Sequence, residues 1–462
     1  MRYPAYPEYK ESGVQWLGRL PGHWEVKATN RVFQLHSGST PKSGEELFWD
    51  GDIIWFTPED LGNNQQKSIT DSKRKITADG YKSCGTSLAK ANSIVISTRA
   101  PIGHLALSTV SACCNQGCRI LEPIHGVPDY WYYVFVTTKS VLNALGQGST
   151  FMELPRQSLA NFKLPVPPVL EQSAIADFLD RETGRIDMLM AKKRRLIELL
   201  REKRSALISR TVTRGLPEAA TCEFGLEPHT RFKDSGIARL GDVPEGWDVK
   251  RLKYSVSIND EALSEKTDPD FEFYYIDIGS VSPVDGIINR EPMVFENAPS
   301  RARRKVLSGD TIVSTVRTYL RAITPIPETA ETLIVSTGFA VVRPRKINSA
   351  FLAYALRETS FVEDIVSRST GVSYPAVNAS EIGDISITVP SQEEQIAIAS
   401  YLDRETAKID RLVEKVEEAL DRLQEYRTAL ITAAVTGKID VRGAARSDGK
   451  RVPFHEPEAV HG

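Results

Sequence analysis

Residues 171–213 read EQSAIADFLDRETGRIDMLMAKKRRLIELLREKRSALISRTVT, and residues 394–436 read EQIAIASYLDRETAKIDRLVEKVEEALDRLQEYRTALITAAVT. The two stretches align without a gap at an offset of 223 residues, and both contain Leu-Asp-Arg-Glu-Thr and Ala-Leu-Ile. This period is far longer than that of a solenoid repeat. The sequence therefore indicates a half-protein that was duplicated within one chain.

Each copy predicts one long helix, because neither contains proline and glycine is nearly absent. Apolar residues recur at alternating steps of three and four, which is typical of a coiled-coil seam. At about 1.5 Å per residue, each helix would be roughly 60 Å long. The predicted helix-pairing seam consists of Ile175, Leu179, Ile186, Leu189, Leu196, Leu200 and Leu207 in the first copy, and Ile398, Leu402, Ile409, Leu412, Val416, Leu423 and Leu430 in the second.

The two predicted helices differ in charge. Residues 181–214 contain 11 basic and 4 acidic residues, a net charge of +7, whereas the matching residues 404–437 contain 6 and 7, a net charge of −1. Any single charge on such a helix is most simply explained as part of a solvated face. The pattern alone leaves pairing within one chain or between chains open. The contrast between the copies nevertheless favours pairing within the chain over two equivalent self-pairing seams.

The duplication extends beyond the helices, since KESG at 10–13 matches KDSG at 233–236 at the same offset. Each repeat is thus a globular segment of about 160 residues followed by a helix. Both segments predict a mixed, strand-rich α/β fold. The expected strands are 52–56, 93–98 and 118–121 in the first segment, and 271–278, 311–316 and 339–342 in the second.

Proline-rich junctions divide the chain, because proline is excluded from helix interiors and from central strands. The fold class predicted is α+β, with two similar domains separated and followed by long helices. The predicted boundaries are 1–165 and 231–389 for the globular segments, 166–215 and 390–440 for the helices, 216–230 for a linker, and 441–462 for a polar tail expected to fray.

Composition limits the possible functions. The 462 residues are 41% hydrophobic and 26% charged, which is ordinary for a globular protein, and the net charge is −2. Nucleic-acid binding would therefore depend on local basic patches. We find neither an apolar run of about 18 residues nor a signal-peptide core, so a cytoplasmic protein is expected.

No catalytic or metal-binding signature is present. The sequence has no P-loop, no dinucleotide fingerprint, no GxSxG, no HExxH and no amino-methyltransferase motif. The five cysteines lack disulfide or zinc spacing, and we expect them to be small buried residues: Cys84, Cys113, Cys114, Cys118 and Cys222. The sequence therefore predicts no catalytic site, no metal and no cofactor bound by this chain.

Binding candidates are basic, hydroxyl-bearing and aromatic residues at predicted loops and strand ends. Arg and Lys can neutralise phosphates or read guanine, and Ser and Thr offer adaptable hydrogen bonds. A solvated loop is the ordinary alternative for the basic runs 73–75 and 301–305, and core packing is the favoured one for Trp24, Trp49 and Trp55. The candidates are Ser39, Thr40, Lys42, Lys73, Arg74, Lys75, Arg99, Ser149 and Thr150 in the first segment, and Arg301, Arg303, Arg304, Lys305, Arg317, Tyr319, Arg321, Ser373 and Tyr374 in the second.

Taken together, the chain resembles the specificity subunit of a type I DNA restriction–modification system. The resemblance covers nearly the whole chain and rests on the order of segments and helices. It also rests on several short motifs: PPVLEQ at 167–172 and PSQEEQ at 390–395, GSTP at 38–41 before Ile53 and Trp55, Asn115-x-Gly117, and VTGKI at 435–439. The second segment departs from this pattern, because it lacks the GSTP turn and has Ser336 in place of Asn115.

The resemblance implies a function without catalysis. Each globular segment would be a target-recognition domain that reads one half of a split double-stranded DNA site. The helices would pair antiparallel within the chain, act as a spacer and dock two methyltransferase subunits, which use S-adenosylmethionine. Motor–nuclease subunits, which use ATP and Mg, would complete the restriction complex. The alternative is a coiled-coil adaptor that joins protein partners and binds no DNA; a stand-alone enzyme is disfavoured by the missing motifs.

Overall fold

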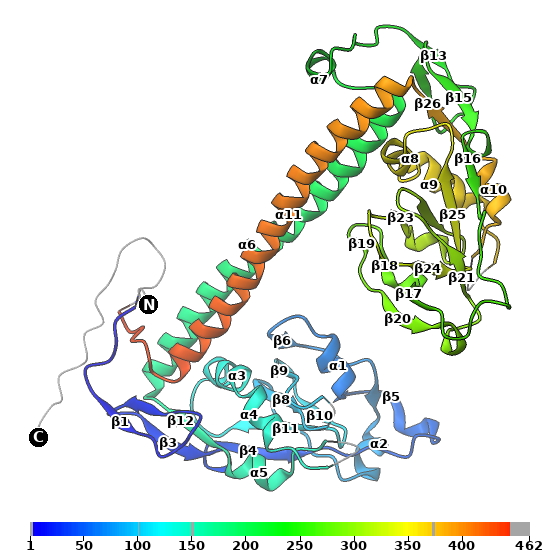
Figure 1. Cartoon of the computed structure of the whole chain (residues 1–462). Coiled ribbons are helices and arrows are strands. Elements are labelled where there is room, and N and C mark those ends of the chain that lie inside the picture. The colour runs from blue at the N-terminus through cyan, green and yellow to red at the C-terminus, as the bar shows by residue number, and fades with distance from the viewer. Residues whose placement is uncertain (1–2, 100, 149–151, 372–374, 444–462) are drawn as a thin grey trace, which may run out of the picture. The chain divides into compact units, whose positions relative to one another are not determined.

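A computed structural model describes residues 3–99, 101–148, 152–371 and 375–443 (Figure 1). The chain divides into two compact units, one formed by residues 1–193 and 418–462 and the other by residues 194–417. Each unit contains one globular domain and parts of both long helices, α6 (Val169–Arg214) and α11 (Gln392–Val435). We call residues 3–168 domain 1 and residues 215–391 domain 2.

Domain 1 is built on a five-stranded sheet of order β4-β11-β8-β9-β6 and a three-stranded sheet of order β10-β5-β7. All residues of β8 are buried, as expected for a central strand rich in β-branched side chains. Helix α3 packs against β8 and β9 (Figure 1). The strands are β1 (Tyr9–Glu11), β2 (Arg19–Pro21), β3 (Glu25–Ala28), β4 (Phe33–Ser37), β5 (Trp49–Phe56), β6 (Ser68–Ile69), β7 (Lys75–Ile76), β8 (Ser93–Ser97), β9 (Leu105–Ser108), β10 (Ala112–Cys114), β11 (Cys118–Pro123) and β12 (Lys163–Val166), and the helices are α1 (Pro58–Asn63), α2 (Ala78–Ser83), α3 (Pro128–Thr137), α4 (Lys139–Ala144) and α5 (Arg156–Asn161).

Domain 2 repeats this plan with two four-stranded sheets, of orders β16-β25-β22-β23 and β20-β17-β24-β21. The parallel pair β17–β24 corresponds to the parallel pair β5–β10 of domain 1. The strands are β13 (Phe232–Asp234), β14 (Asp242–Pro244), β15 (Asp248–Arg251), β16 (Val256–Ile258), β17 (Glu272–Ile276), β18 (Val281–Ser282), β19 (Gly286–Ile287), β20 (Glu291–Val294), β21 (Ala302–Lys305), β22 (Thr311–Ser314), β23 (Ile323–Pro325), β24 (Leu333–Ser336), β25 (Phe339–Pro344) and β26 (Ser386–Val389), and the helices are α7 (Glu218–Glu223), α8 (Ser349–Ala355), α9 (Thr359–Arg368) and α10 (Ala379–Gly383).

The six strands expected from the sequence are confirmed as β5, β8, β11, β17, β22 and β25. In the first basic run, Lys73 and Arg74 lie in a bend, as expected, and Lys75 begins β7. The second run is not in a loop, because residues 302–305 form β21. The proline-rich run before the first long helix closes domain 1, since α6 begins at Val169. Pro165 of this run lies within β12, which pairs only with β3, so the missing N–H is tolerated at an edge.

The expected linker and tail are partly ordered. Residues 218–223 form α7, and Leu216 and Ala220 are buried in the core of domain 2. Within the predicted tail, Val441 is only 1% exposed, while residues 444–462 lie outside the described part of the chain. Cys84 is half-buried and Cys222 is exposed, which corrects the expectation that every cysteine is buried. In α7 the side chains before Cys222 face the core, so that of Cys222 faces solvent.

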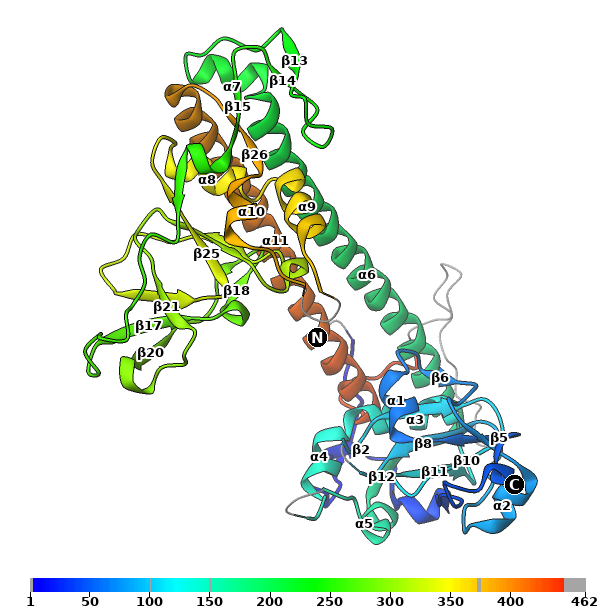
Figure 2. The same cartoon turned by 90° about the vertical axis from the view of Figure 1, so that its right-hand side faces the viewer.

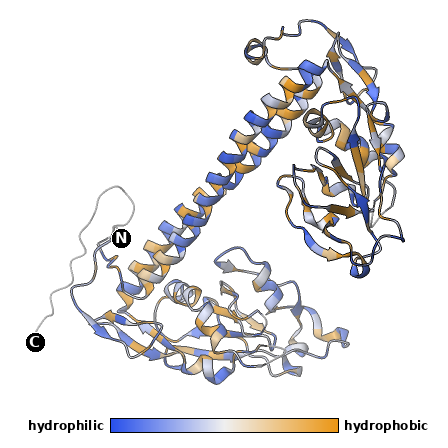
Figure 3. Cartoon of the chain, in the orientation of Figure 1, coloured by the Kyte–Doolittle hydropathy of each residue, from blue (hydrophilic) through white to orange (hydrophobic). Residues whose placement is uncertain are grey.

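The long helices α6 and α11 lie side by side and antiparallel, as Figures 1 and 2 show, so the predicted intramolecular pairing is confirmed. Hydrophilic and hydrophobic residues alternate around both helices (Figure 3), which leaves only a narrow apolar seam between them. In the unit of domain 1, Ile186 and Met190 share a core with Leu430 and Ile431.

The seam does not follow the predicted heptads throughout. Leu189, Leu196 and Leu412 are 44%, 43% and 50% exposed, whereas Met190 and Ile197 are buried. The other predicted seam residues are buried (Ile175, Leu179, Ile186, Ile398, Leu402, Ile409 and Leu430) or half-buried (Leu200, Leu207, Val416 and Leu423).

The inner positions instead recur every 11 residues. They are Ile175, Ile186, Ile197 and Ile208 in α6 and Ile398, Ile409, Leu420 and Ile431 in α11, and all are buried except Leu420, which is half-buried. An 11-residue repeat corresponds to about 3.67 residues per turn, close to that of a straight helix, so the buried stripe drifts away from a strict 7-residue pattern. This drift explains why Leu189 and Leu196 face solvent.

Candidate nucleic-acid interface

In domain 1, the candidate residues converge on the turn 115–117 between β10 and β11. The backbone N–H of Gly117 donates to Asn115 Oδ1 (2.9 Å), and the N–H of Arg99 donates to the carbonyl of Gly117 (3.3 Å). On the other side of the turn, the hydroxyl of Thr40 donates to the side chain of Gln116. The turn thus brings Thr40 and Arg99 together although they are far apart in sequence.

The loop that carries Ser39 and Thr40 needs a glycine at position 38. A Cβ atom on Gly38 would lie 1.8 Å from the carbonyl oxygen of Asn115, so no other residue fits without displacing the turn. The N–H of Ser39 donates to the carbonyl of Cys114 (3.0 Å). The Gly-x-Thr-Pro motif therefore seats the polar loop directly on the turn.

A pair of tryptophans supports the same loop. Trp49 and Trp55 pack edge to face with ring centres 5.2 Å apart, and both are buried, as is Trp24, so the expected core packing is confirmed. Their indole N–H groups donate to the carbonyls of Lys42 (3.2 Å) and Ser39 (2.9 Å). The guanidinium of exposed Arg74 lies 3.5 Å from the centre of the Trp49 ring. The stacking holds Arg74 beside the loop 38–42.

Three of the remaining cationic candidates of domain 1 have acidic partners. Lys73 lies 2.8 Å from Glu59, and this hydrogen bond raises the pKa of Lys73. Lys75 and Arg99 each lie 3.1 Å from a carboxylate, of Asp71 and Glu153 respectively. Lys42 and Arg74 have no such partner among the described residues. These two side chains are thus the ones whose charge is free to meet a phosphate or a base.

Domain 2 has a matching turn, at 336–338 between β24 and β25. The N–H of Gly338 donates to Ser336 Oγ (3.2 Å), so serine makes the hydrogen bond that asparagine makes in domain 1. Both the N–H and the hydroxyl of Thr315 donate to the carbonyl of Gly338 at 2.8 Å. The N–H of Thr337 donates to the carbonyl of Arg301 (2.8 Å). The turn therefore joins Arg301 to the segment that leads into Arg317.

The segment 317–321 has a strained backbone. Arg317 and Arg321 have φ angles of 51° and 52°, in the left-handed region that side-chain-bearing residues rarely adopt. Between them, Tyr319 is 55% exposed. Arg321 lines a cavity that is also lined by residues of the long helices α6 and α11.

The basic strand β21 distributes its side chains over two environments. Arg303 lies 4.9 Å from the centre of the Phe295 ring, and Arg301 is exposed. The Nε of Arg304 is buried and has no hydrogen-bond partner among the described residues, while Lys305 is half-buried. The pairing of β21 with β24 thus determines which way these side chains point, whereas an exposed loop would leave them all in solvent. The candidates Ser149, Thr150, Ser373 and Tyr374 lie outside the described residues.

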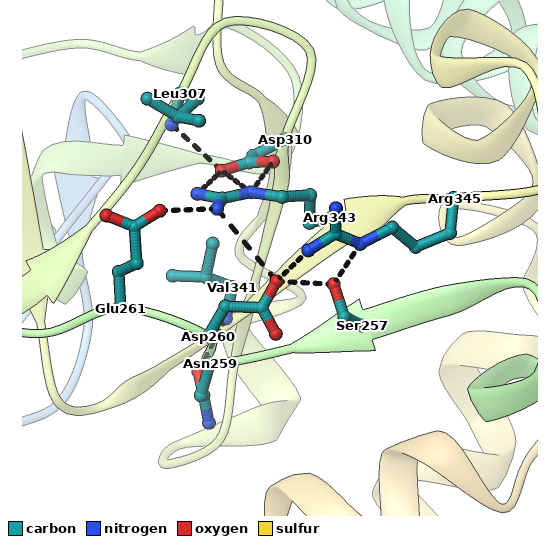
Figure 4. A network of polar contacts seen from close by, with 9 residues as sticks. All are labelled: Ser257, Asn259, Asp260, Glu261, Leu307, Asp310, Val341, Arg343 and Arg345. Carbon is teal, nitrogen blue, oxygen red and sulfur yellow. Dashed lines mark hydrogen bonds and ion pairs between the residues drawn. The ribbon is translucent and has the colours of Figure 1, made fainter.

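An ion-pair network in domain 2 joins β25 to the residue before β22 and to the segment that follows β16 (Figure 4). Arg343 on β25 donates to the buried carboxylate of Asp310 (2.9 and 3.0 Å) and to Glu261 (2.8 Å). Arg345 lies 2.6 Å from Asp260. In domain 1 the position that corresponds to Arg343 carries a negative charge instead, because it is occupied by Glu122. The carboxylate of Glu122 lies 3.0 Å from His36 and 3.1 Å from Lys90.

The start of each long helix is anchored to its domain by a buried carboxylate. Glu171 accepts hydrogen bonds from the hydroxyl of Tyr6 and from the indole N–H of Trp24 (3.0 Å), and lies 2.8 Å from His23 Nε2. Burial is the main cause that raises the pKa of Tyr6, so it stays a donor.

The second helix uses the same anchor. Glu394 accepts from the indole N–H of Trp247 (2.8 Å) and lies 2.6 Å from His229 Nε2. His229 is the residue that occupies the Tyr6 position at the offset of 223. The Glu of each Glu-Gln motif thus fixes the helix to the first strands of its own domain.

Two further contacts complete each anchor. The next residue, Gln172 or Gln395, accepts from the N–H of Val127 (3.0 Å) or of Asn348 (2.8 Å). About two turns farther on, the Asp of each Leu-Asp-Arg-Glu-Thr accepts a tyrosine hydroxyl: Asp180 from Tyr133 (2.6 Å) and Asp403 from Tyr354 (2.7 Å). Burial raises the pKa of Tyr354 to about 12. We did not predict these positioning residues individually. The sequence feature that could have indicated them is that the same residue types occur at matching positions of the two copies.

The described residues contain no cluster of three or more His, Cys, Asp or Glu side chains that could hold a metal ion. In the same part of the chain, no helix has a stretch apolar and long enough to cross a bilayer.

Comparison with known proteins matches this arrangement to one family. The family model described as "Type I restriction modification DNA specificity domain" matches twice, at residues 21–199 and 244–422. The chain is 26% identical to the type I restriction enzyme MjaIX specificity subunit of Methanocaldococcus jannaschii, over 94% of this chain and 97% of that protein. It is 29% identical to the EcoR124I/EcoR124II specificity subunit of Escherichia coli over 39% of this chain and 45% of that protein.

Two solved structures share the fold. One, from a study of complex assembly and conformational transition of the type I R-M system, superposes with a TM-score of 0.60 at 17% identity and covers 91% of this chain and 99% of that one. The other, the HsdS subunit of Thermoanaerobacter tengcongensis, has a TM-score of 0.50 at 16% identity and covers 91% and 98%. With the family model matched in both halves, the chain belongs to the DNA specificity subunits of type I restriction–modification systems, the non-catalytic subunits that recognise DNA within the complex.

Proposed function

We propose that the chain reads a bipartite double-stranded DNA site, with domain 1 on one half-site and domain 2 on the other. The observation that carries the proposal is the pair of turns, 115–117 and 336–338, each of which collects polar and cationic residues from separate strands of its domain. Cations and hydroxyl groups on a rigid scaffold are the groups that contact phosphates and base edges.

In domain 1, Arg74, Lys42, Ser39 and Thr40 form the proposed reading surface, because the tryptophan pair holds them together. Arg74 and Lys42 also lack acidic partners among the residues that the structure describes. In domain 2, Arg301, Arg317 and Tyr319 form it. Lys73, Lys75 and Arg99 would contact phosphates only by exchanging their present carboxylate partners. We assign them to positioning on the backbone of the DNA rather than to base reading.

The helix pair is proposed to set the distance between half-sites and to dock the partner subunits. Each unit of the chain carries one copy of the same domain–helix junction, so two identical methyltransferase subunits can bind equivalent surfaces. S-adenosylmethionine would be bound by these partners, and ATP and Mg by the motor–nuclease subunits. We propose the cytoplasm as the compartment, since the target is DNA.

A titration of duplex DNA with the chain and its methyltransferase partner tests the proposal. Binding of a bipartite site should weaken as salt rises, because phosphate contacts release counterions. Loss of either half-site should abolish specific binding. Absence of salt-dependent binding, or binding to a single half-site with unchanged affinity, contradicts the proposal. The adaptor alternative has lost its support, because the matched family model is that of a DNA specificity domain.

A further inference from the structure

A cavity of about 640 Å³ lies within the unit formed by residues 194–417, bounded by α6, α11 and domain 2. Its size is in the range of pockets that hold small organic ligands. Four arginines, Arg201, Arg204, Arg321 and Arg357, line it together with apolar side chains that include Ile323. The lining therefore offers both positive charge and an apolar wall.

Two of these arginines are neutralised by carboxylates of α11. Arg204 donates to Asp410 through two nitrogen atoms (2.9 and 3.3 Å), and Arg201 lies 3.2 Å from Glu417. Two other acidic residues, Asp285 and Glu414, also line the cavity. The cavity is thus not a general basic patch, and any anion must bind at a particular arginine.

Arg357 is that arginine. Its Nε donates to the carbonyl of Ala353 (2.9 Å), and its guanidinium lies 4.7 Å from the centre of the Tyr354 ring. Burial lowers the pKa of Arg357, and no carboxylate forms an ion pair with it among the described residues. The nearest carboxylates are occupied, since Asp403 accepts the hydroxyl of Tyr354 and Asp410 accepts Arg204. Within the part of the chain that the structure describes, the guanidinium therefore retains N–H donors without an acceptor.

Domain 1 shows what a complete arrangement looks like. Beside Tyr133, the counterpart of Tyr354, the ammonium of Lys67 lies 4.9 Å from the ring centre and 2.5 Å from each of Asp129 and Asp180. There the cation beside the tyrosine has two carboxylate partners, whereas Arg357 forms an ion pair with no carboxylate of the described residues.

The position of Arg357 itself is occupied by a valine in domain 1. Tyr133 and Thr138 match Tyr354 and Thr359 at an offset of 221, which places Val136 opposite Arg357. The domain 1 junction forms with this valine, so an arginine is not needed to close the junction. Arg357 is half-buried. A cation that is partly removed from water without a carboxylate partner among the described residues is costly, and its presence points to a ligand that completes it.

We propose that the cavity binds a small organic anion, whose phosphate or carboxylate group accepts hydrogen bonds from Arg357 and whose body packs against Ile323 and Val362. The planar guanidinium suits a two-oxygen acceptor of either kind. This site is independent of DNA reading, because none of the proposed base-reading residues lines the cavity.

Calorimetric titration of the full-length chain tests the site with phenyl phosphate, benzoate and uncharged phenol as probes. We expect saturable binding of phenyl phosphate, benzoate or both, and none of phenol; the preferred anion identifies the chemical class. Arg357→Val should weaken the binding at least tenfold. Arg357→Lys should leave an intermediate affinity, because the positive charge remains but the planar guanidinium that donates two parallel hydrogen bonds is lost. This variant replaces Arg357→Val in the test if the valine variant does not fold.

Arg411→Val is the matched control. Arg411 is exposed, lies outside the cavity and donates through Nε to the carbonyl of Ala407 (3.2 Å), as Arg357 does to Ala353. Its loss should leave binding unchanged. Equal binding of phenol, unchanged binding by Arg357→Val, or no binding of either anion overturns the proposal. So does a result in which Arg357→Val weakens only DNA binding by the assembled complex, which would assign the arginine to a DNA phosphate.

Discussion

Arg204 of α6 and Asp410 of α11 form a two-bond ion pair, with Nε–Oδ1 and Nη2–Oδ2 distances of 2.9 and 3.3 Å. The equivalent residues in the other copy of the repeat, at the offset of 223, are Arg427 and Asp187. They form the same pair at 2.8 and 3.2 Å. Each unit of the chain thus has the same interhelical contact, with the helices exchanged. Internal twofold symmetry is encoded in individual side chains as well as in the fold.

We expect Asp187→Asn and Asp410→Asn to destabilise the helix pair slightly, by about 0.3–1 kcal/mol each, because both carboxylates are about half exposed. Thermal unfolding at low and high salt measures this, and the loss should shrink at high salt. Glu198→Gln, which removes only a contact to Arg195 within α6, is the control. An equal loss in the control would show that interhelical pairing is not the cause.

Removal of 11 residues from each helix, 191–201 and 414–424, should preserve the apolar seam, because the inner positions recur at this interval. The pair would shorten by about 16 Å, which corresponds to up to about five base pairs of DNA. Methylome sequencing should then show closer half-sites with unchanged half-site bases. Altered bases would contradict the spacer role.

Removal of four residues from each helix is the matched comparison. Four residues exceed one turn by about 40°, so the seam on one side of the deletion would rotate away from its partner. We expect a lower melting temperature than for the 11-residue variant, although fewer residues are lost. The opposite order of melting temperatures would argue against the 11-residue seam.

Arg74→Ala should weaken binding to the half-site of domain 1 by about tenfold, the loss typical of one well-placed base contact. Competition with duplexes altered in one half-site at a time measures the effect. Lys82→Ala, an exposed cation of α2 paired with Asp79, is the control and should change little. A uniform loss over all sequences would instead assign Arg74 to the phosphate backbone.

Glu122 gives a prediction for pH dependence. Burial raises its pKa, but hydrogen bonds from the backbone and side chain of Lys90 outweigh this, and the net pKa is lowered. A lowered folded-state pKa gives stability that is present above the unfolded pKa, about 4.3, and is lost as pH falls through the folded value. Chemical unfolding measures the effect: between pH 6 and about pH 3, the Glu122→Gln variant should lose less stability than the wild type does. Glu45→Gln, at an exposed position, is the control and should lose as much stability as the wild type over this range.

Sequence reasoning captured the features that repeat along the chain. The helices, six strands and the duplication follow from periodicity and from offsets between residue numbers. The 11-residue seam was missed because steps of three and four satisfy a heptad equally well over short distances, and only the exposure of Leu189 and Leu196 separates the two. The strand β21 was missed because a run of arginines has low strand propensity, and pairing with β24 overrides it.

The candidate site was predictable only in part. Residue type and loop position pointed to Ser39, Thr40 and Arg74, but not to the turn that gathers them, because the contact of Gly38 with Asn115 joins residues 77 positions apart. The cavity lined by Arg321 was not predictable for the same reason, since its lining includes residues of the distant helices. Long-range contacts of single residues leave no periodic trace in a sequence.

The buried anchors Glu171 and Glu394 have a consequence for how new specificities arise. Both use a tryptophan indole at the same spacing, and both are followed by the same glutamine and aspartate contacts. A gene segment that retains these few partners can be exchanged by recombination while the rest of its domain diverges. Under the proposed function, half-sites are thus exchangeable in evolution, while the helix anchors are inherited unchanged.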